Sequence, residues 1–567
     1  MLVFYVTCTV ALFERTWRAP GRFTVGTGGD PNLEMWALGW TIHAISHPHG
    51  GLFLTDYINY PFGVNLMWNS PQLLHGLVLW PVTAILGPVF AYNLMVTLNI
   101  ALSAWCAYLA ARRFVRTTLP AVVGGLVYGF SPYMMAQGRD HTTLVAAFVP
   151  PLLVLVLYDI FVDHRWPAWR SGIALGALAA CQLLIAEELL ASEVLVALLA
   201  LGVATLFQVE AVAAGLRHAV RAVAAASAAF LVVCVYPLLI QFVGPHRLRG
   251  AVQAPNVFVS DLTNFVVPTS VQALSPAWAV ARSSHWTGNL SEFNGYLGLP
   301  LIALALVVAI RHWDSASIRV ASITGLIVAV LSLGPSLHIG GVDEKIWMPW
   351  RLFGSLPLVA DILPTRLMVY VDLVAALFVA VYIDDLFALR SRSARLGHMA
   401  LVVATAVTLF PVFPYPAHPE MVPRFFTDGS ARMIAPGSVV LISPFQQLYP
   451  AEPMLWQAET GMRFRIPQGY FIGPNANGKP VYGAPLSSLS VAMLEIQGGG
   501  GPNFSDDLRK SVRRDLALRK VETIVVGPTN NEERMLQFFE FVLGQAPLSV
   551  SDVYVWPGVS RLVTAGT

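Results

Sequence analysis

The side chains best suited to chemistry in this sequence are ionisable residues that lie beside or within long apolar segments. Burying a charge among apolar groups is costly, so a charge at such a position is a candidate for function. Ten residues meet this description: Asp30, Glu34, Arg139, Asp140, His141, Glu187, Glu188, Glu193, Glu292 and Arg366. Their types permit proton transfer by a carboxylate and binding of a phosphate by an arginine.

Asp30 is the first of these residues, in the segment Gly28-Gly29-Asp30-Pro31 before a predicted helix. Glu34 follows one helical turn later and can face the same way as Asp30. An aspartate followed by proline is a good helix start, so capping is one interpretation of Asp30. A catalytic carboxylate is the other, and the two are compatible because a capping aspartate can still be aimed at a substrate.

Arg139-Asp140-His141 closes the third predicted span on the side where Asp30 lies. An interfacial anchor is the ordinary interpretation of such a cluster. The placement of Asp140 as a second carboxylate on the same face as Asp30 favours a site instead.

Glu187, Glu188 and Glu193 lie between two apolar runs. A solvated turn would explain Glu187 and Glu188. It explains Glu193 poorly, because that residue lies about one turn inside a predicted span.

Glu292 ends a long polar outer segment, and Arg366 begins the tenth predicted span from the outside. A guanidinium there suits a phosphate or pyrophosphate arriving from the lipid surface. The alternative is an arginine that reaches towards lipid headgroups. His47 and His49 flank a proline without a readable third ligand, which favours loop residues over a metal site. No cofactor is therefore predicted with certainty, although a divalent cation (Mg²⁺ or Mn²⁺) is compatible with the acidic residues.

The elements that must position these residues are membrane helices. The chain has 567 residues, of which 56% are hydrophobic and only 12% charged. Average soluble domains carry about 25% charged residues, so lipid is the main solvent expected here. A net charge of +2 gives no basic field for a nucleic acid. The four cysteines all fall in apolar stretches and predict free thiols.

A membrane helix needs about 20 mostly apolar residues. Runs that meet or approach this length lie at 90–111, 119–137, 142–162, 171–186, 189–207, 222–243, 297–310, 320–335, 367–383 and 398–413. The shorter apolar segment Met1–Phe13 precedes them. The sequence therefore predicts a polytopic α-helical membrane protein with about eleven transmembrane helices.

Arginines in the short loops predict the orientation. With Met1 inside, every inner loop is basic, as the positive-inside rule requires. The arginines concerned are Arg112, Arg113, Arg116, Arg165, Arg170, Arg217, Arg221, Arg311, Arg319, Arg390, Arg392 and Arg395. This places 14–89, 244–296, 336–366 and everything after about 414 on the outer side. The expected location is a multi-pass protein of the cell inner (plasma) membrane.

Two regions differ from simple helical spans. The large first outer loop, 14–89, contains two apolar pieces, Leu33–Ser46 and Gln72–Leu86, which we expect to lie along the membrane interface. For the second piece, a re-entrant segment covered by protein is an equal alternative. After residue 413, short β-branched runs alternate with helical patterns. Strands are expected at Val439–Ser443, Thr523–Gly527 and Asp552–Trp556, and helices at Leu486–Gln497, Ser505–Leu518 and Asn531–Leu543. The predicted division is a membrane domain, 1–413, and a small extracytoplasmic α/β domain, 414–567.

The order of these features resembles the GT-C superfamily of polyprenyl-phosphate-sugar-dependent integral membrane glycosyltransferases. That superfamily includes protein mannosyltransferases and lipid A aminoarabinose transferases. The matching stretch is about 26–165. It holds an acidic residue in Gly29-Asp30-Pro31, interface helices, a span ending in Phe130-Ser131-Pro132-Tyr133, and then Gly138-Arg139-Asp140-His141.

The resemblance implies an inverting transfer of a sugar from a lipid-linked phosphate. In members with this layout a carboxylate in the first outer loop is the general base on the acceptor hydroxyl, and Asp30 matches that position. Asp140 matches the second acidic position, which orients the acceptor or a metal. The implied partners are the lipid bilayer, a polyprenyl-phosphate-linked sugar, and a glycan, lipid or protein acceptor of the cell envelope. The short first span and the lack of an acidic pair in the first loop depart from the pattern.

Two other classes remain open. One is a membrane transporter or flippase of a lipid-linked or polar envelope precursor, because intramembrane carboxylates such as Glu193 also serve proton-coupled transport. The sequence shows no inverted repeat, which such proteins commonly have. The other is a non-catalytic envelope-assembly protein. The large outer loop and the outer domain fit a surface-facing enzyme better than either.

Overall fold

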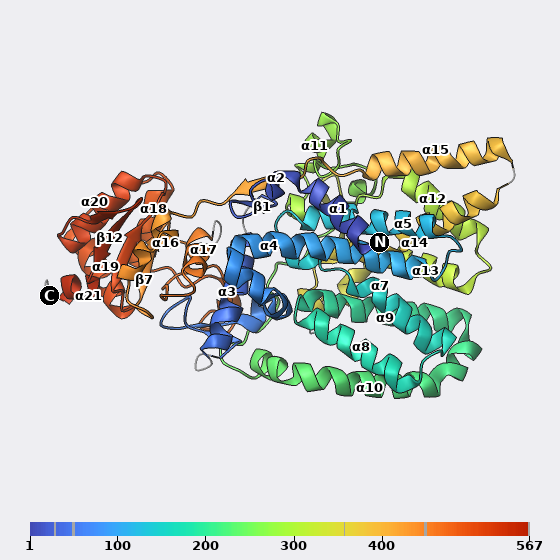
Figure 1. Ribbon diagram of the computed structural model, residues 1–567, viewed down its shortest axis with the longest axis horizontal. Coiled ribbons are helices and arrows are strands. Elements are labelled where there is room, and N and C mark those ends of the chain that lie inside the picture. Colours follow the sequence, from blue (N-terminus) through green and yellow to red (C-terminus); the bar gives the residue numbers. More distant parts are fainter. Residues whose placement is uncertain (28–29, 48–50, 357, 390, 447–450, 565–567) are drawn as a thin grey trace.

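Long apolar helices form one part of the molecule, as the sequence predicts (Figure 1). The structure is a computed structural model that describes residues 1–27, 30–47, 51–356, 358–389, 391–446 and 451–564. Within these ranges six segments are long and apolar enough to cross a membrane: Leu73–Ala111, Thr118–Gln137, Thr142–Asp163, Glu187–Phe207, Val212–Phe242 and Pro364–Ala388. Four shorter apolar helices accompany them: Leu2–Leu12, Gly298–Arg311, Ala316–Ser332 and Arg395–Leu409. The structure thus shows a polytopic helical bundle without fixing the expected number of spans.

The helices of this bundle follow the apolar runs of the sequence closely. They are α1 (Leu2–Leu12), α4 (Leu73–Ala111), α5 (Thr118–Gly129), α6 (Pro132–Gln137), α7 (Val149–Tyr158), α8 (Ala168–Leu183), α9 (Glu187–Phe207), α10 (Val209–Phe242), α12 (Gly298–Arg311), α13 (Ala316–Ser332), α14 (Met368–Ala388) and α15 (Arg392–Leu409). One difference concerns Arg217 and Arg221, which were expected in a loop. They lie exposed on the early turns of α10, because that helix begins thirteen residues before the run 222–243.

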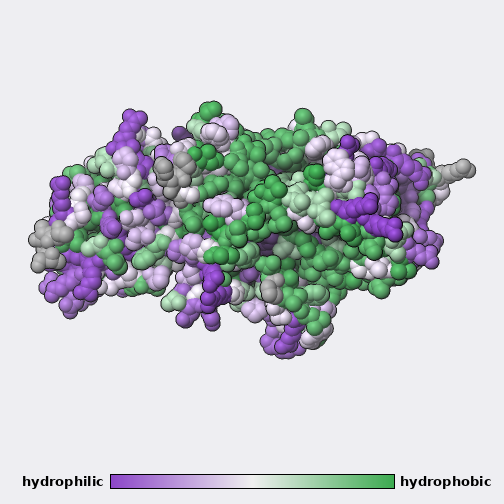
Figure 2. Space-filling view, turned by 90° about the horizontal axis from the view of Figure 1, so that it is seen from below, coloured by the Kyte–Doolittle hydropathy of each residue, from purple (hydrophilic) through white to green (hydrophobic). Residues whose placement is uncertain are grey.

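Burial distinguishes central from peripheral helices. α14 is buried along most of its length and packs against α5, α12 and α13. α10 is largely exposed and packs mainly on α8, so the two form an outer layer of the bundle (Figure 1). Exposed apolar side chains give a broad hydrophobic band between more hydrophilic ends (Figure 2). A band of this kind is the surface that a lipid bilayer would cover.

The first outer loop is more deeply integrated than expected. It contains α2 (Glu14–Trp17), β1 (Phe23–Val25), α3 (Pro31–Ser46), β2 (Leu54–Thr55), β3 (Val64–Asn65) and the 3₁₀ turn η2 (Leu66–Trp68). α3 does not lie along a free interface: Met35, Trp36 and Leu38 are fully buried between α4 and α17 (Glu452–Glu459). The piece expected at Gln72–Leu86 is the first part of α4, which is interrupted only at Gly87 (φ 84°) before Pro88. Glycine permits this left-handed conformation, so one long apolar element changes direction there.

The remaining segments that connect the helices of the bundle contain short elements. They are η3 (Thr142–Val145), η5 (Leu262–Phe265), α11 (Ala277–Ser283), η6 (Leu290–Glu292), the antiparallel hairpin of β4 (Ser336–Ile339) and β5 (Val342–Trp347), η7 (Pro349–Leu352), η8 (Val359–Asp361) and η9 (Pro364–Leu367). A π-helical turn, η4 (Asp159–Asp163), directly follows the C-terminus of α7. η3, η6 and η9 lead directly to candidate residues.

The C-terminal part contains a four-stranded sheet with the order β11-β12-β10-β7. Its strands are β7 (Val440–Ser443), β10 (Thr523–Val526), β11 (Leu548–Val550) and β12 (Val553–Pro557), and β7 and β10 are parallel. Helices α18 (Ser488–Gln497), α19 (Asp506–Leu518), α20 (Glu532–Leu543) and α21 (Val559–Thr564) accompany the sheet. β7, β10 and β12 occupy the three segments expected to be strands.

Further short elements join this part to the first outer loop. They are β6 (Ala417–Pro419), α16 (Arg424–Thr427), η10 (Ser430–Met433), α17, β8 (Ile472–Pro474) and β9 (Pro480–Tyr482). β6 pairs with β1 in an antiparallel ladder, and α17 packs on α3. Residues on either side of the predicted domain boundary are therefore in close contact.

Candidate active site

A cavity of about 990 Å³ lies between the bundle and the outer segments. At one end its wall carries the ionisable residues Asp30, Glu34, His141, Glu188, Glu292 and Arg366. Its other wall is aliphatic and comes mainly from one face of α9, with contributions from α8 and α10. Tyr470 and Tyr482, from the C-terminal part, also line it. Glu187 lines it as well, so the fold brings seven of the predicted residues to one cavity.

Asp30 stands at the N-terminus of α3, but its carboxylate does not cap that helix. Oδ2 lies 3.5 Å from Nε2 of His141, and the side chain is 21% exposed. Oδ1 is buried without a hydrogen-bond partner in the described structure. A carboxylate oxygen with no partner beside a cavity is available to a ligand, so the capping interpretation does not account for this side chain.

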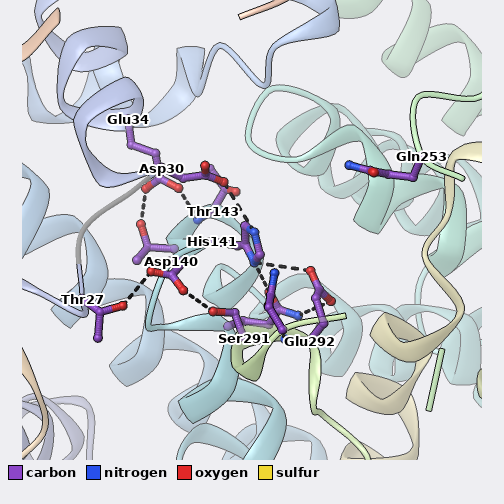
Figure 3. Close-up of polar contacts among 12 residues, drawn as sticks. Thr27, Asp30, Glu34, Asp140, His141, Thr143, Gln253, Ser291 and Glu292 are labelled. Carbon is purple, nitrogen blue, oxygen red and sulfur yellow. Dashed lines mark hydrogen bonds and ion pairs between the residues drawn. The ribbon is translucent and has the colours of Figure 1, made fainter. Parts of the chain in front are cut away.

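His141 connects Asp30 to a second carboxylate (Figure 3). Its Nδ1 lies 3.4 Å from Oε1 of Glu292 and 3.0 Å from Oε1 of Gln137. Gln137 in turn donates to Oε2 of Glu292 over 3.1 Å. The imidazole is therefore held by Gln137 on α6 and lies between the carboxylates of Glu292 on η6 and Asp30 at the start of α3.

Arg366, on η9, is enclosed by carboxylates. Its Nε donates to Glu292 over 3.0 Å, and its two terminal nitrogens contact Glu292 and Glu188. The side chains of Arg366 and Glu292 are only 14% and 2% exposed. Its charge is thus compensated within the protein, so the alternative interpretation, a contact with lipid headgroups, does not describe its main interaction. These contacts use three of the five guanidinium donors, which leaves two for a phosphate.

Glu34 is buried one turn after Asp30. Its carboxylate accepts from the Thr142 hydroxyl and, over 3.3 Å, from the backbone N–H of Thr143. Burial raises the pKa of Glu34 to about 8, and the neighbouring Asp30 adds to this effect. Glu34 is accordingly protonated at neutral pH and can act as a hydrogen-bond donor.

Asp30 and Glu292 respond differently to the same surroundings. Burial raises the pKa of Asp30, while His141 and Tyr470 oppose that rise. Burial also acts on Glu292, but the Arg366 guanidinium and His141 hold the pKa of that carboxyl below its usual value. Glu292 is therefore a fixed anion, whereas Asp30 is a carboxylate with raised proton affinity, which suits a base.

Asp140 and Arg139 lie behind this cluster and do not line the cavity. Asp140 accepts from the hydroxyl of Thr27 over 2.8 Å and from that of Ser291 (Figure 3). The carbonyl of Arg139 accepts from the N–H of Thr27 over 3.1 Å. Asp140 thereby links the first outer loop to η6. Its predicted role in acceptor or metal binding remains a prediction.

Glu187 and Glu193 separate in the structure. Glu187 lines the cavity, where Gln241 donates to it and its Oε1 is buried without a partner in the described structure. Glu193 lies away from the cavity wall, buried within α9, and neither carboxylate oxygen has a partner among the described residues. His49 and Pro48 fall outside the described residues.

Several residues at the site were not predicted. Gln137 and Thr142 orient charged groups, but uncharged polar residues at the ends of apolar runs are too common to stand out. Tyr470 is separated from Asp30 by 440 positions, and nothing local in the sequence connects them. Thr142 and Thr143 directly follow Arg139-Asp140-His141 in the sequence, and this adjacency is the signal that could have identified them.

The acidic residues do not form a ready metal site. Among the described residues no group of three or more His, Cys, Asp or Glu side chains has an arrangement that could hold a metal ion. Glu292 and Glu188 are instead engaged by Arg366. The divalent cation therefore stays a prediction, and the chemistry below uses protein groups alone.

Solved structures with a similar fold include an oligosaccharyltransferase and an arabinofuranosyltransferase. The chain aligns with the oligosaccharyltransferase of Archaeoglobus fulgidus in its apo form (TM-score 0.52, 13% identity), covering 99% of this chain and 71% of that one. A structure of the same enzyme, AglB, with an inhibitory peptide and a dolichol-phosphate gives a TM-score of 0.50 at 13% identity, with 96% and 70% covered. Arabinofuranosyltransferase AftD from mycobacteria gives 0.55 at 13% identity, with 98% of this chain and 41% of AftD covered.

Both enzymes are GT-C glycosyltransferases, so the expected fold is confirmed at that level. At 13% identity the likeness concerns the fold alone. No curated protein matches this chain in sequence. Residues 2–359, more than half of the chain, match a family model described as a domain of unknown function, and the chain belongs to that family, DUF6311.

Proposed function

We propose that this protein transfers a sugar from a polyprenyl-phosphate donor to an acceptor of the cell envelope, with inversion at the anomeric carbon. One observation carries the proposal: a single cavity joins a cluster of buried ionisable groups to an aliphatic wall. On that wall Val194 and Leu198 are 52% and 62% exposed, so the cavity adjoins the lipid-facing surface. A substrate with a polar head and a long apolar chain matches both ends.

The residues divide the reaction between them. Asp30 takes the proton of the acceptor hydroxyl as the hydroxyl oxygen attacks the anomeric carbon. Oδ1 of Asp30, which has no partner among the described residues, is the atom available for this. The bond between that carbon and the phosphate oxygen breaks, and the phosphate departs with the electron pair. The two remaining donors of Arg366 stabilise the developing charge. His141 and Glu292 keep these groups in place.

The solved relatives support the lipid phosphate without identifying it. AglB was solved with a dolichol-phosphate and a peptide, which are ligands of that enzyme. For this chain the acceptor is a glycan, lipid or protein, and the reaction takes place on the outer face of the membrane.

The test is sugar transfer in membranes that contain the wild type, Asp30→Asn or Asp314→Asn, supplied with radiolabelled polyprenyl-phosphate sugars. Loss of general base catalysis should lower the rate about 10²–10⁴-fold in Asp30→Asn. Asp314 is an exposed carboxylate between α12 and α13, at the opposite end of the bundle, and Asp314→Asn should retain wild-type transfer.

Two results would contradict the proposal. Full transfer by Asp30→Asn removes Asp30 as the base. If a folded, inserted wild type transfers sugar from no donor, the enzyme class is wrong and transport is favoured. The first residue to study would then be Glu193, which lies in a candidate span and has no partner for its carboxylate among the described residues.

A further inference from the structure

A C-terminal segment, 466–472, runs alongside the first outer loop. The N–H groups of Asn59 and Tyr60 donate to the carbonyls of Gln468 and Ile466 over 3.0 and 3.1 Å. At the far end, the side chain of Asn69 binds both the N–H and the carbonyl of Ile472, over 2.6 and 3.0 Å. These bonds hold the segment at both ends.

Gly469 lets this segment pass close to the loop. Its φ of 146° lies in a region that side chains rarely adopt, and a Cβ there would be 3.1 Å from Ile58. A glycine is therefore required immediately before Tyr470. The backbone N–H of Tyr470 then donates to Sδ of Met454 on α17, and its ring enters the cavity wall.

Tyr470 is fixed in the wall of the cavity that Asp30 also lines. The residue is 8% exposed, and its ring stacks on that of Tyr482 with a ring-centroid separation of 6.2 Å. The hydroxyl of Tyr482 in turn accepts from Gln253, which belongs to the segment after α10. Tyr470 lines the same cavity as Asp30, and its hydroxyl is one of the groups that oppose the rise in the pKa of that carboxyl caused by burial.

α3 and α17 fix the two partners relative to one another. Asp30 begins α3, and Trp36 on the same helix donates to Oε1 of Gln457 on α17 over 2.6 Å. Gly39 faces Ala458 and Met462 so closely that a Cβ would lie 3.3 Å from each. The start of α3 and the segment after α17 are therefore fixed relative to one another by this packing.

We propose that Tyr470 is a positioning residue for Asp30, so that the C-terminal part completes the site when it docks on the first outer loop. The inference rests on the proposed function for the role of Asp30 as a base. The structural part of the inference does not depend on that role. The phenol of Tyr470, which belongs to the C-terminal part, stabilises the ionised form of Asp30 and orients the carboxylate into the cavity.

Several other groups face Asp30, and a test must separate them from Tyr470. They are Glu34 from its own helix, Asp140 and His141 after α6, and Arg366 on η9. Tyr470→Phe removes one hydroxyl and leaves all of these in place, together with the ring stack on Tyr482.

The first measurement needs no sugar transfer. A hydrophobic carbodiimide modifies protonated carboxyls, so labelling of Asp30 against pH, resolved by mass spectrometry, gives the midpoint of its titration. In Tyr470→Phe the midpoint should rise by about one pH unit, because the ionised carboxylate loses a donor. Asn69→Ala, which loosens the segment but keeps the phenol, should raise it as well. Tyr554→Phe, in the distant sheet, should leave it unchanged.

The second measurement is the pH dependence of sugar transfer. A base works only when it is deprotonated. A higher midpoint therefore moves the acid limb of the rate profile of Tyr470→Phe to higher pH. The kcat should fall by a larger factor than the factor by which the KM for the donor changes. Unchanged labelling midpoints in folded Tyr470→Phe and Asn69→Ala overturn the inference. Because labelling is independent of transfer, the inference and the proposed function can fail separately.

Discussion

At the scale of single residues, the site depends on a buried ion cluster. Arg366 lies between Glu188 and Glu292, and all three are largely withdrawn from solvent. Bringing charges into such a place costs desolvation energy, which is offset only while every charge keeps its partner. Removal of one partner therefore lowers the free energy of unfolding by more than the net contribution of the pair to stability.

Arg366→Gln should lower the free energy of unfolding by about 3–5 kcal/mol, because two buried carboxylates lose their cation. The measurement is denaturant unfolding in detergent. Arg18→Gln is the control: Arg18 pairs with Glu14 at 73% and 45% exposure. An exposed pair of this kind is worth about 0–1 kcal/mol.

A double variant tests whether this loss comes from the pairing itself. Arg366→Gln with Glu292→Gln should lose about 0.5–3 kcal/mol less than the two single changes added together. Simple additivity would show that the two side chains do not stabilise each other.

At the scale of elements, close helix packing forms the wall behind the cavity. Gly172 and Gly176 on α8 face the backbone of α10, where a Cβ would lie 2.2 Å and 2.3 Å from the carbonyl oxygens of Ala222 and Ala226. Small residues four apart let two membrane helices approach closely, and dispersion contacts then hold them together. α8 and α10 thereby act as one layer that carries Leu183 and Leu238 to the cavity.

Gly176→Leu should separate these two helices and lower stability by about 1–3 kcal/mol, since the new side chain meets backbone that cannot give way. Gly202→Leu is a matched control on α9, where a Cβ would have no neighbour within 4 Å. Its effect should stay within about 0.5 kcal/mol. Equal thermal midpoints for the two variants in detergent would contradict the packing argument.

At the scale of the whole molecule, the cavity joins the membrane bundle to the outer segments. The lining residues of α9 recur at helical spacing: Leu190, Ala191, Val194, Leu195, Leu198 and Leu199. One face of a single helix therefore leads from the charged cluster towards the lipid-facing surface. This continuity is what a donor anchored in the bilayer requires.

Leu198→Trp should raise the KM for a long-chain polyprenyl-phosphate donor about tenfold, because displacing about two methylene-sized groups of the chain costs about 1.6 kcal/mol. A short-chain donor should be affected much less. Leu206→Trp is the control, since Leu206 is on the same helix, 81% exposed and not part of the cavity wall. An equal KM for both donors in Leu198→Trp would show that the chain lies elsewhere.

Local pattern determined much of the architecture. The apolar runs at 189–207 and 297–310 became α9 and α12, and the β-branched run at Thr523–Gly527 became β10. Such elements are predictable because their signal is a periodicity or length contained in neighbouring residues. The same holds for Asp30 and Arg366 as candidates, since a charge beside an apolar run is visible in the sequence alone.

Tertiary structure decided what these charges do. The sequence offered Arg366 as a free cation for phosphate or headgroups, and folding surrounded it with Glu188 and Glu292 from segments far apart in the chain. It also buried α3 beneath α17 and brought Tyr470 to Asp30. Partners of this kind follow from packing between distant elements, and the free energy of that packing is shared by contacts that no local stretch of one sequence encodes.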